Sequence, residues 1–196
     1  MLEKLSQTEH LDRDELYNCI ESMFDMSSKV RVYRHLTDYS GNYDEVYNEY
    51  AVLNLKEVEQ KLADYYLDHV LLEETKDIEH LYYVPKVVTT YLKCEALKAL
   101  VYNHLGQKVY ATDKCGQFDF VIFDDSAVLL LDFTPEGALK GGFLSTLPDD
   151  VKYVSDVYDE YRQGAVDYLK RVPCETSTKN GLNRKINQLK SSLNLK

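Results

Sequence analysis

The chain of 196 residues contains no tryptophan, only eight glycines and four prolines, and no long apolar run. No stretch approaches the ~18 apolar residues that a membrane helix needs, and the first ten residues lack the apolar core of a signal peptide. The glycines form neither a Gly-x-Gly-x-x-Gly fingerprint nor a phosphate loop. These absences predict a cytoplasmic protein without a membrane span.

Cysteine is also scarce, and its spacing excludes the usual metal motifs. Cys19, Cys94, Cys115 and Cys174 form no Cys-x-x-Cys pair, and no histidine lies at a ligand spacing from any of them. Reduced thiols that act as small packing residues are expected in a reducing cytosol. We therefore predict no metal site and no cofactor.

The five histidines form none of the common catalytic patterns. Neither His-x-x-x-His nor His-Glu-x-x-His occurs, and there is no Gly-x-Ser-x-Gly elbow. His35 ends a basic strand and is expected at the surface, whereas His104 suits the last turn of a helix. The histidine pattern predicts no catalytic residue.

Four carboxylates in the second half of the chain are the best enzymatic candidates: Asp119, Asp124, Asp125 and Asp132. Restriction-enzyme-like nucleases place an Asp on one strand and Asp/Glu-x-Lys on the next, but the sequence from residue 132 reads Asp-Phe-Thr. Asp124 and Asp125 are typical turn residues, and a hairpin turn at 135–137 puts Asp132 opposite Lys140. The sequence favours structural roles for these carboxylates.

The chain is instead rich in tyrosine and in acidic residues. It has 17 tyrosines and a net charge of −10. Residues 36–83 carry twelve acids against three lysines, while residues 174–196 carry five basic residues against one acid. An acidic body repels phosphate, which argues against direct nucleic-acid binding outside the tail.

The acidic stretch has two interpretations that the sequence leaves open. Carboxylates set on helices among aromatic rings can imitate duplex phosphates, which follow one another about every 1.7 Å along the axis. A row of like charges is more commonly a solvated face. The candidate partner-binding carboxylates are Asp64, Asp68, Glu73 and Glu74.

The basic tail has an amphipathic pattern. Leu182, Ile186, Leu189 and Leu193 recur at spacings of four, three and four residues, with basic residues on the other faces. About fourteen residues are marginal as an isolated helix, so the stripe needs a surface to cover it. That surface is a protein partner, a second copy in a homodimer, a membrane surface or the body of the same chain.

Periodicity predicts an α+β fold in which an antiparallel β-meander, about 108–144, packs against several helices. Residues 1–173 form one domain and residues 174–196 a basic amphipathic tail. Helices are expected at 12–26, 55–71, 85–104, 148–170 and 182–195, and strands at 29–35, 108–112, 118–123, 127–133 and 138–144.

The apolar residues of the 85–104 helix and of the meander are expected in one common core. The helix is apolar over a wide arc, and short connections in the meander favour antiparallel neighbours. The residues predicted to be buried together are Leu97, Leu100, Val101, Val121, Phe123, Leu129 and Leu131.

Two stretches of the chain resemble an uncharacterised bacterial family, a domain of unknown function that is frequently encoded beside helix-turn-helix regulators. They lie at about 30–40 and 117–170. The resemblance rests on Val30-Arg31-Val32, Leu36-Thr37-Asp38-Tyr39, the segment Phe118 to Asp125, Leu131-Asp132-Phe133, Gly137, Gly141-Gly142, Tyr161-Arg162 and Ala165. The chain departs from the family in its missing tryptophan, its acidic insertion near 43–104 and its basic tail. The resemblance implies a bacterial accessory or regulatory protein, with no catalytic residues to carry over.

The leading functional prediction is a non-enzymatic regulatory protein of a bacterial or mobile-element system that binds a protein partner, such as a helix-turn-helix regulator or another DNA-binding protein. The alternatives are an acidic inhibitor that mimics DNA and binds a defence protein, and an enzyme whose motif is not recognised. The prediction rests on missing catalytic motifs, segregated charge and two surfaces suited to docking.

Overall fold

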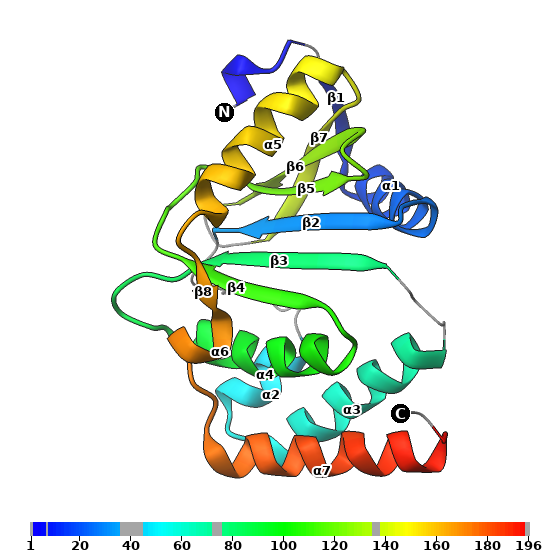
Figure 1. Cartoon of the computed structure of the whole chain (residues 1–196), viewed down its shortest axis with the longest axis vertical. Helices are drawn as coiled ribbons and strands as arrows, with labels where there is room; N and C mark the ends of the chain where they lie inside the picture. Colours follow the sequence, from blue (N-terminus) through cyan, green and yellow to red (C-terminus); the bar gives the residue numbers. More distant parts are fainter. Residues whose placement is uncertain (1, 7, 36–44, 72–75, 135–137, 195–196) are drawn as a thin grey trace.

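The computed structural model describes residues 2–6, 8–35, 45–71, 76–134 and 138–194. Within these residues, eight strands form one mixed sheet in the order β1-β7-β6-β5-β2-β3-β4-β8 (Figure 1). The strands are β1 (Glu9–Asp12), β2 (Lys29–Arg34), β3 (Asp77–Tyr83), β4 (Lys108–Thr112), β5 (Asp119–Phe123), β6 (Ala127–Phe133), β7 (Leu139–Ser145) and β8 (Val166–Asp167). The helices are η1 (Leu2–Lys4), α1 (Arg13–Met26), α2 (Glu45–Ala51), α3 (Leu55–Leu71), α4 (Thr90–His104), α5 (Pro148–Arg162), α6 (Tyr168–Arg171) and α7 (Thr176–Ser192). The predicted α+β class is confirmed.

The meander is shorter than predicted, because one of its four expected strands lies elsewhere in the sheet. Strands β5, β6 and β7 pair antiparallel in succession. Strand β4 is instead parallel to β3, and β3 is parallel to β2. The connection from β4 to β5 therefore crosses two strands and is not a hairpin.

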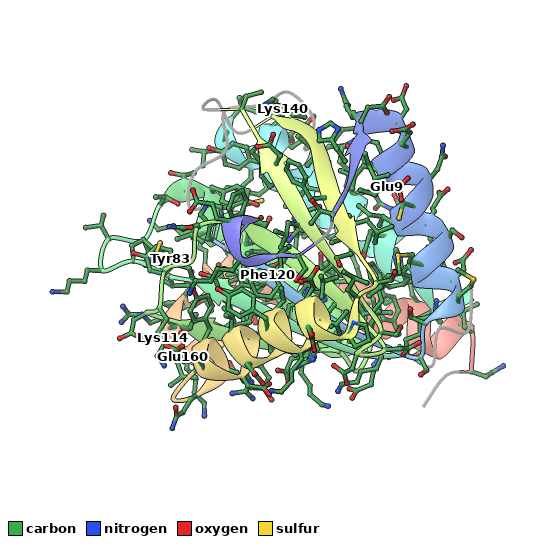
Figure 2. All side chains as sticks on the ribbon, turned by 90° about the horizontal axis from the view of Figure 1, so that it is seen from above. Glu9, Tyr83, Lys114, Phe120, Lys140 and Glu160 are labelled. Atoms are coloured by element: carbon green, nitrogen blue, oxygen red, sulfur yellow. The ribbon has the colours of Figure 1, made fainter. Side chains whose placement is uncertain are left out.

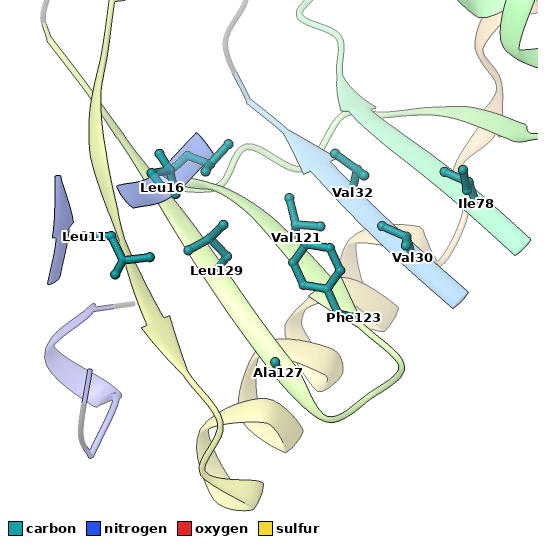
Figure 3. Close-up of a cluster of buried hydrophobic side chains, with 10 residues drawn as sticks. Leu11, Leu16, Val30, Val32, Ile78, Val121, Phe123, Ala127 and Leu129 are labelled. Atoms are coloured by element: carbon teal, nitrogen blue, oxygen red, sulfur yellow. The ribbon is translucent and has the colours of Figure 1, made fainter. Parts of the chain in front are cut away.

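Two helices cover opposite faces of the upper half of the sheet (Figure 1). Alternation sends every second side chain to one face. On one face, Val30, Val121 and Leu129 pack with Leu16 of α1 (Figure 3). On the other face, Tyr33, Phe120 and Leu130 pack with Val154 and Tyr158 of α5. This arrangement explains the near-continuous apolar runs of β5 and β6, which are buried on both sides.

The 85–104 helix does not lie on the meander as predicted. Helix α4 begins at Thr90, where the Thr89 side chain caps it, and it packs on β4 with α6. Leu97, Leu100 and Val101 are buried with α3 and α7. The strand residues Val121, Phe123, Leu129 and Leu131 are buried with α1 in a separate cluster. All seven residues are buried, but they form two clusters, because β2 and β3 stand between the meander and α4.

The tail forms α7, which packs on the body of the same chain. Leu182 and Ile186 are fully buried against Val58 and Leu62 of α3, and Leu189 is partly buried beside them. Helix α7 lies at the opposite end of the molecule from β1 (Figure 1). The sequence left open which surface covers the apolar stripe. In the structure, α3 and α4 of the same chain cover it.

Local interactions define the ends of two helices. The Asp12 side chain accepts from the backbone of Asp14 and Glu15, and the Glu15 side chain accepts from the Asp12 backbone N–H, which completes a capping box at α1. Gly106 follows α4 with φ of +82°, the left-handed conformation expected of a glycine just past a helix end. In contrast, the helix predicted over 148–170 ends at Arg162, and β8 and α6 follow.

The pairing of β7 with β6 is irregular next to Gly141. The register against β6 shifts between Asp132 and Phe133, which pair with Gly141 and Leu139. A Cβ atom on Gly141 would lie 2.4 Å from the Leu11 carbonyl oxygen. Glycine is therefore required at 141 for β1 to approach β7.

None of the described helices is both long enough and apolar enough to cross a membrane.

Candidate functional site

The candidate site is a cleft at the ends of β2 and β3, on the face of the sheet that carries α1 and α4. Ligands of open α/β sheets bind outside the carboxyl ends of parallel strands, where the chain turns to opposite sides. Strands β2 and β3 are parallel, and their carboxyl ends both lie at this cleft. The cleft has a volume of about 680 Å³, which suits a small ligand or a peptide side chain.

Four tyrosines give the cleft its character, and we call it the tyrosine cleft. Tyr17 comes from α1, Tyr82 from β3, and Tyr91 and Tyr102 from α4. Burial raises the pKa of Tyr82 and Tyr91 well above 10, and nearby Glu95 raises both further. These phenols stay protonated, so they can donate hydrogen bonds and offer ring faces to a flat ligand.

The apolar part of the cleft comes from the meander, α1 and α2. It consists of Ile20, Val46, Leu131, Phe133 and Leu139. These side chains adjoin the cluster beneath α1, since Leu131 is buried in it and Ile20, Phe133 and Leu139 pack against it. One wall is thus rigid and dry, which favours burial of an apolar ring or side chain.

A buried carboxylate lies at the floor of the tyrosine cleft. The Asp119 side chain is only 1% exposed. Its Oδ1 accepts from the backbone N–H of His35 and lies 2.6 Å from His35 Nδ1. Its Oδ2 lies 3.6 Å from Arg34 Nη1 and has no hydrogen-bond partner among the described residues. Burial acts to lower the pKa of the Arg34 guanidinium, but Asp119 and the smaller effects of nearby tyrosines together raise it.

This arrangement corrects the prediction that His35 is a surface residue. Its side chain is 28% exposed and is held by Asp119, which lies 84 residues away in the sequence. The Asp119 carboxylate therefore fixes the orientation of the His35 ring at the end of β2.

A second ion pair lies on the α4 wall. Lys98 Nζ is 2.7 Å from Glu95 Oε1, and the Tyr82 hydroxyl donates to Glu95 Oε2 at 3.1 Å. Glu95 is buried and Lys98 is 17% exposed at its side chain. The cleft thus combines both signs of charge, because Asp119, Glu95 and Glu45 line it together with Arg34 and Lys98.

His80 lies on β3 beside this floor. Its ring stacks on Tyr102 with centroids 4.5 Å apart, and Nε2 lies 2.9 Å from Gln107 Oε1. Burial lowers the pKa of His80 to about 4, the Gln107 contact opposes this, and nearby Arg34 lowers it further. His80 is therefore neutral at physiological pH and supports the Tyr102 ring from behind.

A second hollow of similar volume, about 690 Å³, lies near η1 and α5. Its walls include Lys4, Cys115, Tyr153 and Tyr161. Close by, Lys114 Nζ donates to the Glu160 carbonyl at 2.6 Å (Figure 2). The tyrosine cleft is the stronger candidate, because only there does a buried carboxylate oxygen without a described donor line the cavity.

The acidic residues singled out in the sequence lie apart from this floor. Asp64 and Asp68 are exposed on α3, one turn apart. Glu73 and Glu74 lie outside the described residues. The basic helix α7 lies against α3, where Lys185 Nζ donates to Gln60 Oε1 at 2.8 Å. The stripe residues Leu182 and Ile186 are buried, whereas Leu189 and Leu193 are half-buried.

Three of the four carboxylates predicted to have structural roles are found in such roles: Asp124, Asp125 and Asp132. Asp124 and Asp125 both have positive φ in the β5–β6 turn, and Asp132 pairs with Lys140 at 3.0 Å. Asp124 accepts from Ser28 and Lys29, and hydrogen bonds, chiefly that from the Lys29 backbone, lower its pKa.

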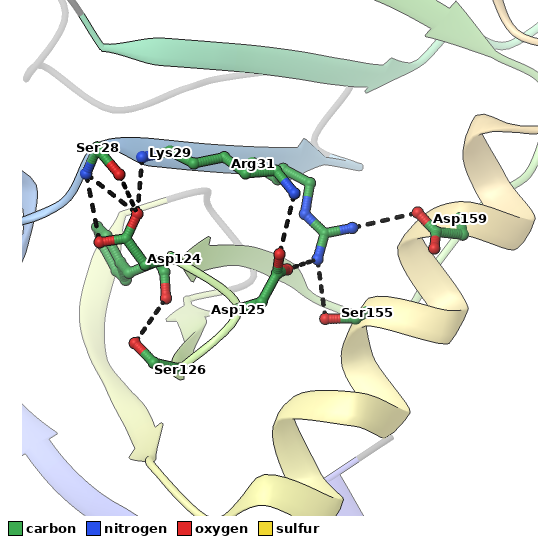
Figure 4. A network of polar contacts seen from close by, with 9 residues as sticks. Ser28, Lys29, Arg31, Asp124, Asp125, Ser126, Ser155 and Asp159 are labelled. Atoms are coloured by element: carbon green, nitrogen blue, oxygen red, sulfur yellow. Dashed lines mark hydrogen bonds and ion pairs between the residues drawn. The ribbon is translucent and has the colours of Figure 1, made fainter.

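Asp125 belongs to a network centred on Arg31, which joins β2, the turn and α5 (Figure 4). Arg31 contacts Asp125, donates to Ser155 Oγ at 2.9 Å and to Asp159 Oδ1 at 3.1 Å. Its guanidinium also lies over the Tyr158 ring at 5.1 Å. This network braces the α5 face and lies on the other side of the sheet from the tyrosine cleft.

Within the described residues, no group of three or more His, Cys, Asp or Glu is placed to hold a metal ion. Asp119 was named as a candidate from the sequence, but its grouping with the other cleft residues was not predicted, because they come from β2, β3, α4 and β5, which are far apart along the chain. The available signals were two buried charges on apolar elements, Glu95 in α4 and Asp119 at the start of β5. Buried charges are rare unless they are paired.

Residues 88–170 match the model of a family described as a domain of unknown function (DUF6879). The match runs from just before α4 to α6, so it includes the α4 wall and Asp119 but not Arg34. The predicted resemblance to a domain of unknown function is confirmed over 117–170; the match does not reach 30–40, and it includes 88–104, which had been assigned to an insertion. No curated protein matches the chain.

Several solved structures are similar in outline. One is TrmBL2, an archaeal chromatin protein, with a TM-score of 0.46 and 11% identity; the match covers 84% of this chain and 55% of TrmBL2. Another is the phospholipase D family member Nuc from Salmonella typhimurium, with a TM-score of 0.47 and 8% identity; the match covers 83% of this chain and 97% of Nuc. A third is NucT from Helicobacter pylori, with a TM-score of 0.41 and 10% identity; the match covers 82% of this chain and 99% of NucT. The chain spans about half the length of TrmBL2.

Proposed function

We propose that the chain is a non-enzymatic regulatory protein that binds a protein partner through the acidic face of α3, with a ligand in the tyrosine cleft setting the affinity. The α3 face is defined by Asp64, Tyr65 and Asp68. All three side chains are exposed, and Tyr65 is 36% accessible. Tyrosine is enriched where proteins meet, because its ring packs while its hydroxyl stays hydrated.

One observation carries the proposal: the tyrosine cleft shares wall residues with a small hollow that Tyr65 of the α3 face also lines. A hollow of about 220 Å³ lies beneath Tyr65, and Val46, Lys98 and Tyr102 line both this hollow and the tyrosine cleft. The Tyr65 and Tyr102 rings are 6.1 Å apart, edge to face. A ligand that moves Tyr102 therefore changes the support of Tyr65, which is the differential contact that a regulatory ligand needs.

The rim of the cleft provides a second link to the same helix. Glu45 of α2 lines the cleft, and its Oε2 lies 2.8 Å from Lys61 Nζ of α3. The hydrogen bond from Lys61 lowers the pKa of Glu45, so this carboxylate is ionised when the pair forms. A ligand that competes for Glu45 would release Lys61 and alter the charge presented by α3.

Charge indicates the chemistry of the partner. The net charge of −10 and the exposed Asp64 and Asp68 attract a basic surface and speed its encounter with this protein. DNA-binding proteins carry such surfaces. A bacterial helix-turn-helix regulator, the partner implied by the family resemblance, fits this description.

The proposal is tested by affinity capture from the native host, with quantitative mass spectrometry of the captured proteins. Four baits are compared: the natural chain, Asp64→Asn with Asp68→Asn, Tyr91→Ala in the cleft, and Arg184→Ala on the exposed face of α7 as the control. We expect one basic protein to be captured by the natural chain and by Arg184→Ala. The double variant should lose about 5- to 50-fold of it, as two rim charges are removed.

The Tyr91→Ala variant tests whether the cleft controls binding at the α3 face. Tyr91→Ala should change the captured amount in either direction, because the ligand no longer sets the state of Tyr102. The proposal is wrong if the same proteins are captured in equal amounts by all four baits.

A DNA-mimicking inhibitor is the second candidate. It is favoured by Asp64 and Asp68, which are exposed one turn apart on a helix, as carboxylates that imitate phosphates need to be. Against it, α7 brings Lys185 to Gln60, which itself donates a hydrogen bond to Asp64. Capture of a nuclease that duplex DNA displaces from the bait would favour the mimic over the regulator.

A further inference from the structure

The charged floor of the tyrosine cleft has an unfilled hydrogen-bonding requirement. Asp119 Oδ1 is occupied by His35, but Oδ2 receives no hydrogen bond from the described residues. Buried carboxylate oxygens are normally paired, because an unpaired one loses its hydration without compensation. The missing element is an N–H or O–H donor that reaches Oδ2 from the cleft.

Arg34 lies beside Asp119 and requires a hydrogen-bond acceptor. Its Nη1 lies 3.6 Å from Asp119 Oδ2, beyond hydrogen-bond distance, and its side chain is 40% exposed. A guanidinium has five N–H donors in a plane and no acceptor. A ligand that suits both residues therefore carries a donor for Asp119 and, next to it in the same plane, an acceptor for Arg34.

The walls of the cleft restrict the shape of that ligand. The rings of Tyr91 and Tyr102 stand on α4, and the apolar side chains of Leu131 and Phe133 face them from the meander. Aromatic faces and a dry wall favour a flat, unsaturated ring. Both tyrosines stay protonated at neutral pH, so neither places a negative charge next to such a ring.

We propose that the tyrosine cleft binds a nucleobase with a ring N–H next to a carbonyl, as in guanine and uracil, the N–H donating to Asp119 Oδ2 and the carbonyl accepting from Arg34. The inference rests on the proposed function, since this base is the regulatory ligand invoked there. Guanine and uracil carry donor and acceptor on adjacent ring atoms. Arginine paired with a carbonyl oxygen is a common way to hold guanine.

The base has two sources, a free nucleoside or nucleotide and an unpaired base of a single strand. The net charge of −10 disfavours a long phosphate chain, because the body repels it at low salt. Lys98 is paired with Glu95, which leaves Arg34 as the cation nearest the base. We therefore expect the free nucleoside or mononucleotide to bind at least as well as a strand.

The test is calorimetric titration of the purified full chain with guanosine, uridine, their 5′-monophosphates and a single-stranded oligouridine. 1-Methylguanosine and 3-methyluridine serve as matched ligands, because methylation removes only the ring N–H. The variants are Asp119→Asn, Tyr91→Ala and the control Asp132→Asn, whose carboxylate pairs with Lys140 on the opposite face of the sheet.

We expect guanosine or uridine to bind with a dissociation constant below about 1 mM. Methylation of the ring nitrogen and Asp119→Asn should each weaken binding by about 10- to 100-fold, the effect of one charge-assisted hydrogen bond. Asp132→Asn should bind as the natural chain does. Circular dichroism and urea melts establish that each variant is folded, and Tyr91→Ala provides a second cleft variant if Asp119→Asn is not.

Two results overturn the inference: no heat of binding with any of the unmethylated ligands, or binding that is indifferent to both the methyl group and Asp119→Asn. An oligouridine that binds more tightly than uridine, and depends on Asp119, identifies a strand as the source of the base. If the titrations fail while the affinity capture behaves as expected, the regulatory function stands and only the ligand class is wrong.

Discussion

His80 is a half-buried side chain that supports the wall shared by the tyrosine cleft and the neighbouring hollow. It stacks on Tyr102, which lines both the cleft and the hollow beneath Tyr65, and it contacts Gln107. Because burial lowers its pKa to about 4, it packs as a neutral ring. Protonation would place a cation beside Arg34 and weaken this support.

The first prediction follows from that lowered pKa. The unfolded chain takes up the proton near pH 6.5 and the folded chain only near pH 4, so the free energy of unfolding is highest above pH 6.5 and falls as the pH drops from 6.5 to 4. Since the ring is only half-buried, we expect a loss of about 1–3 kcal/mol. Urea melts at pH 7 and pH 4.5 measure it. His80→Phe keeps the stacked ring without the titration and should show a smaller loss; an equal loss would mean that His80 is solvated.

At the residue scale, the sequence predicted what depends on near neighbours. The Asp124-Asp125 turn and the Asp132–Lys140 pair each join residues within a few positions or across one short turn. The Asp119–His35 contact joins residues 84 positions apart. Nothing in the local pattern of either residue signals the other, so the floor of the cleft was not predictable.

At the scale of elements, the position of a strand in the sequence was easier to predict than which strands lie beside it in the sheet. Apolar alternation marks a strand but says nothing of which strand lies beside it. Residues 113–118 are enough to span the width of two strands, because six extended residues reach about 20 Å and strands are about 4.8 Å apart. The short link between β4 and β5 therefore did not require a hairpin, and β2 and β3 lie between them.

Helix α7 provides the element-scale prediction. Ile186 is fully buried with Val58, Leu62 and Tyr66 of α3. Ile186→Ala should lower the free energy of unfolding by about 2–5 kcal/mol, because it removes buried methyl groups and leaves a cavity. The exposed Asn187→Ala should change it by less than about 0.5 kcal/mol. If urea melts give Ile186→Ala the same small effect, α7 is only loosely docked.

At the scale of the whole molecule, the segregation of charge that the sequence displays is partly neutralised by the fold. The basic α7 lies against the acidic α3, and Lys185 and Lys190 reach Gln60 and Tyr66. Asp64, Tyr65 and Asp68 nevertheless remain exposed. The molecule thus offers a partner the face of α3, while most of the apolar stripe of α7 is already covered.

The most direct test of the account is photo-crosslinking in the native host from a photoreactive phenylalanine at position 68 of α3, compared with one at position 187 of α7. Both positions are exposed on helices of the same length, so the two probes are matched. We predict a crosslink to one basic protein from position 68 and none to that protein from position 187. A partner captured only from position 187, or equally from both, would contradict the claim that α3 is the binding face.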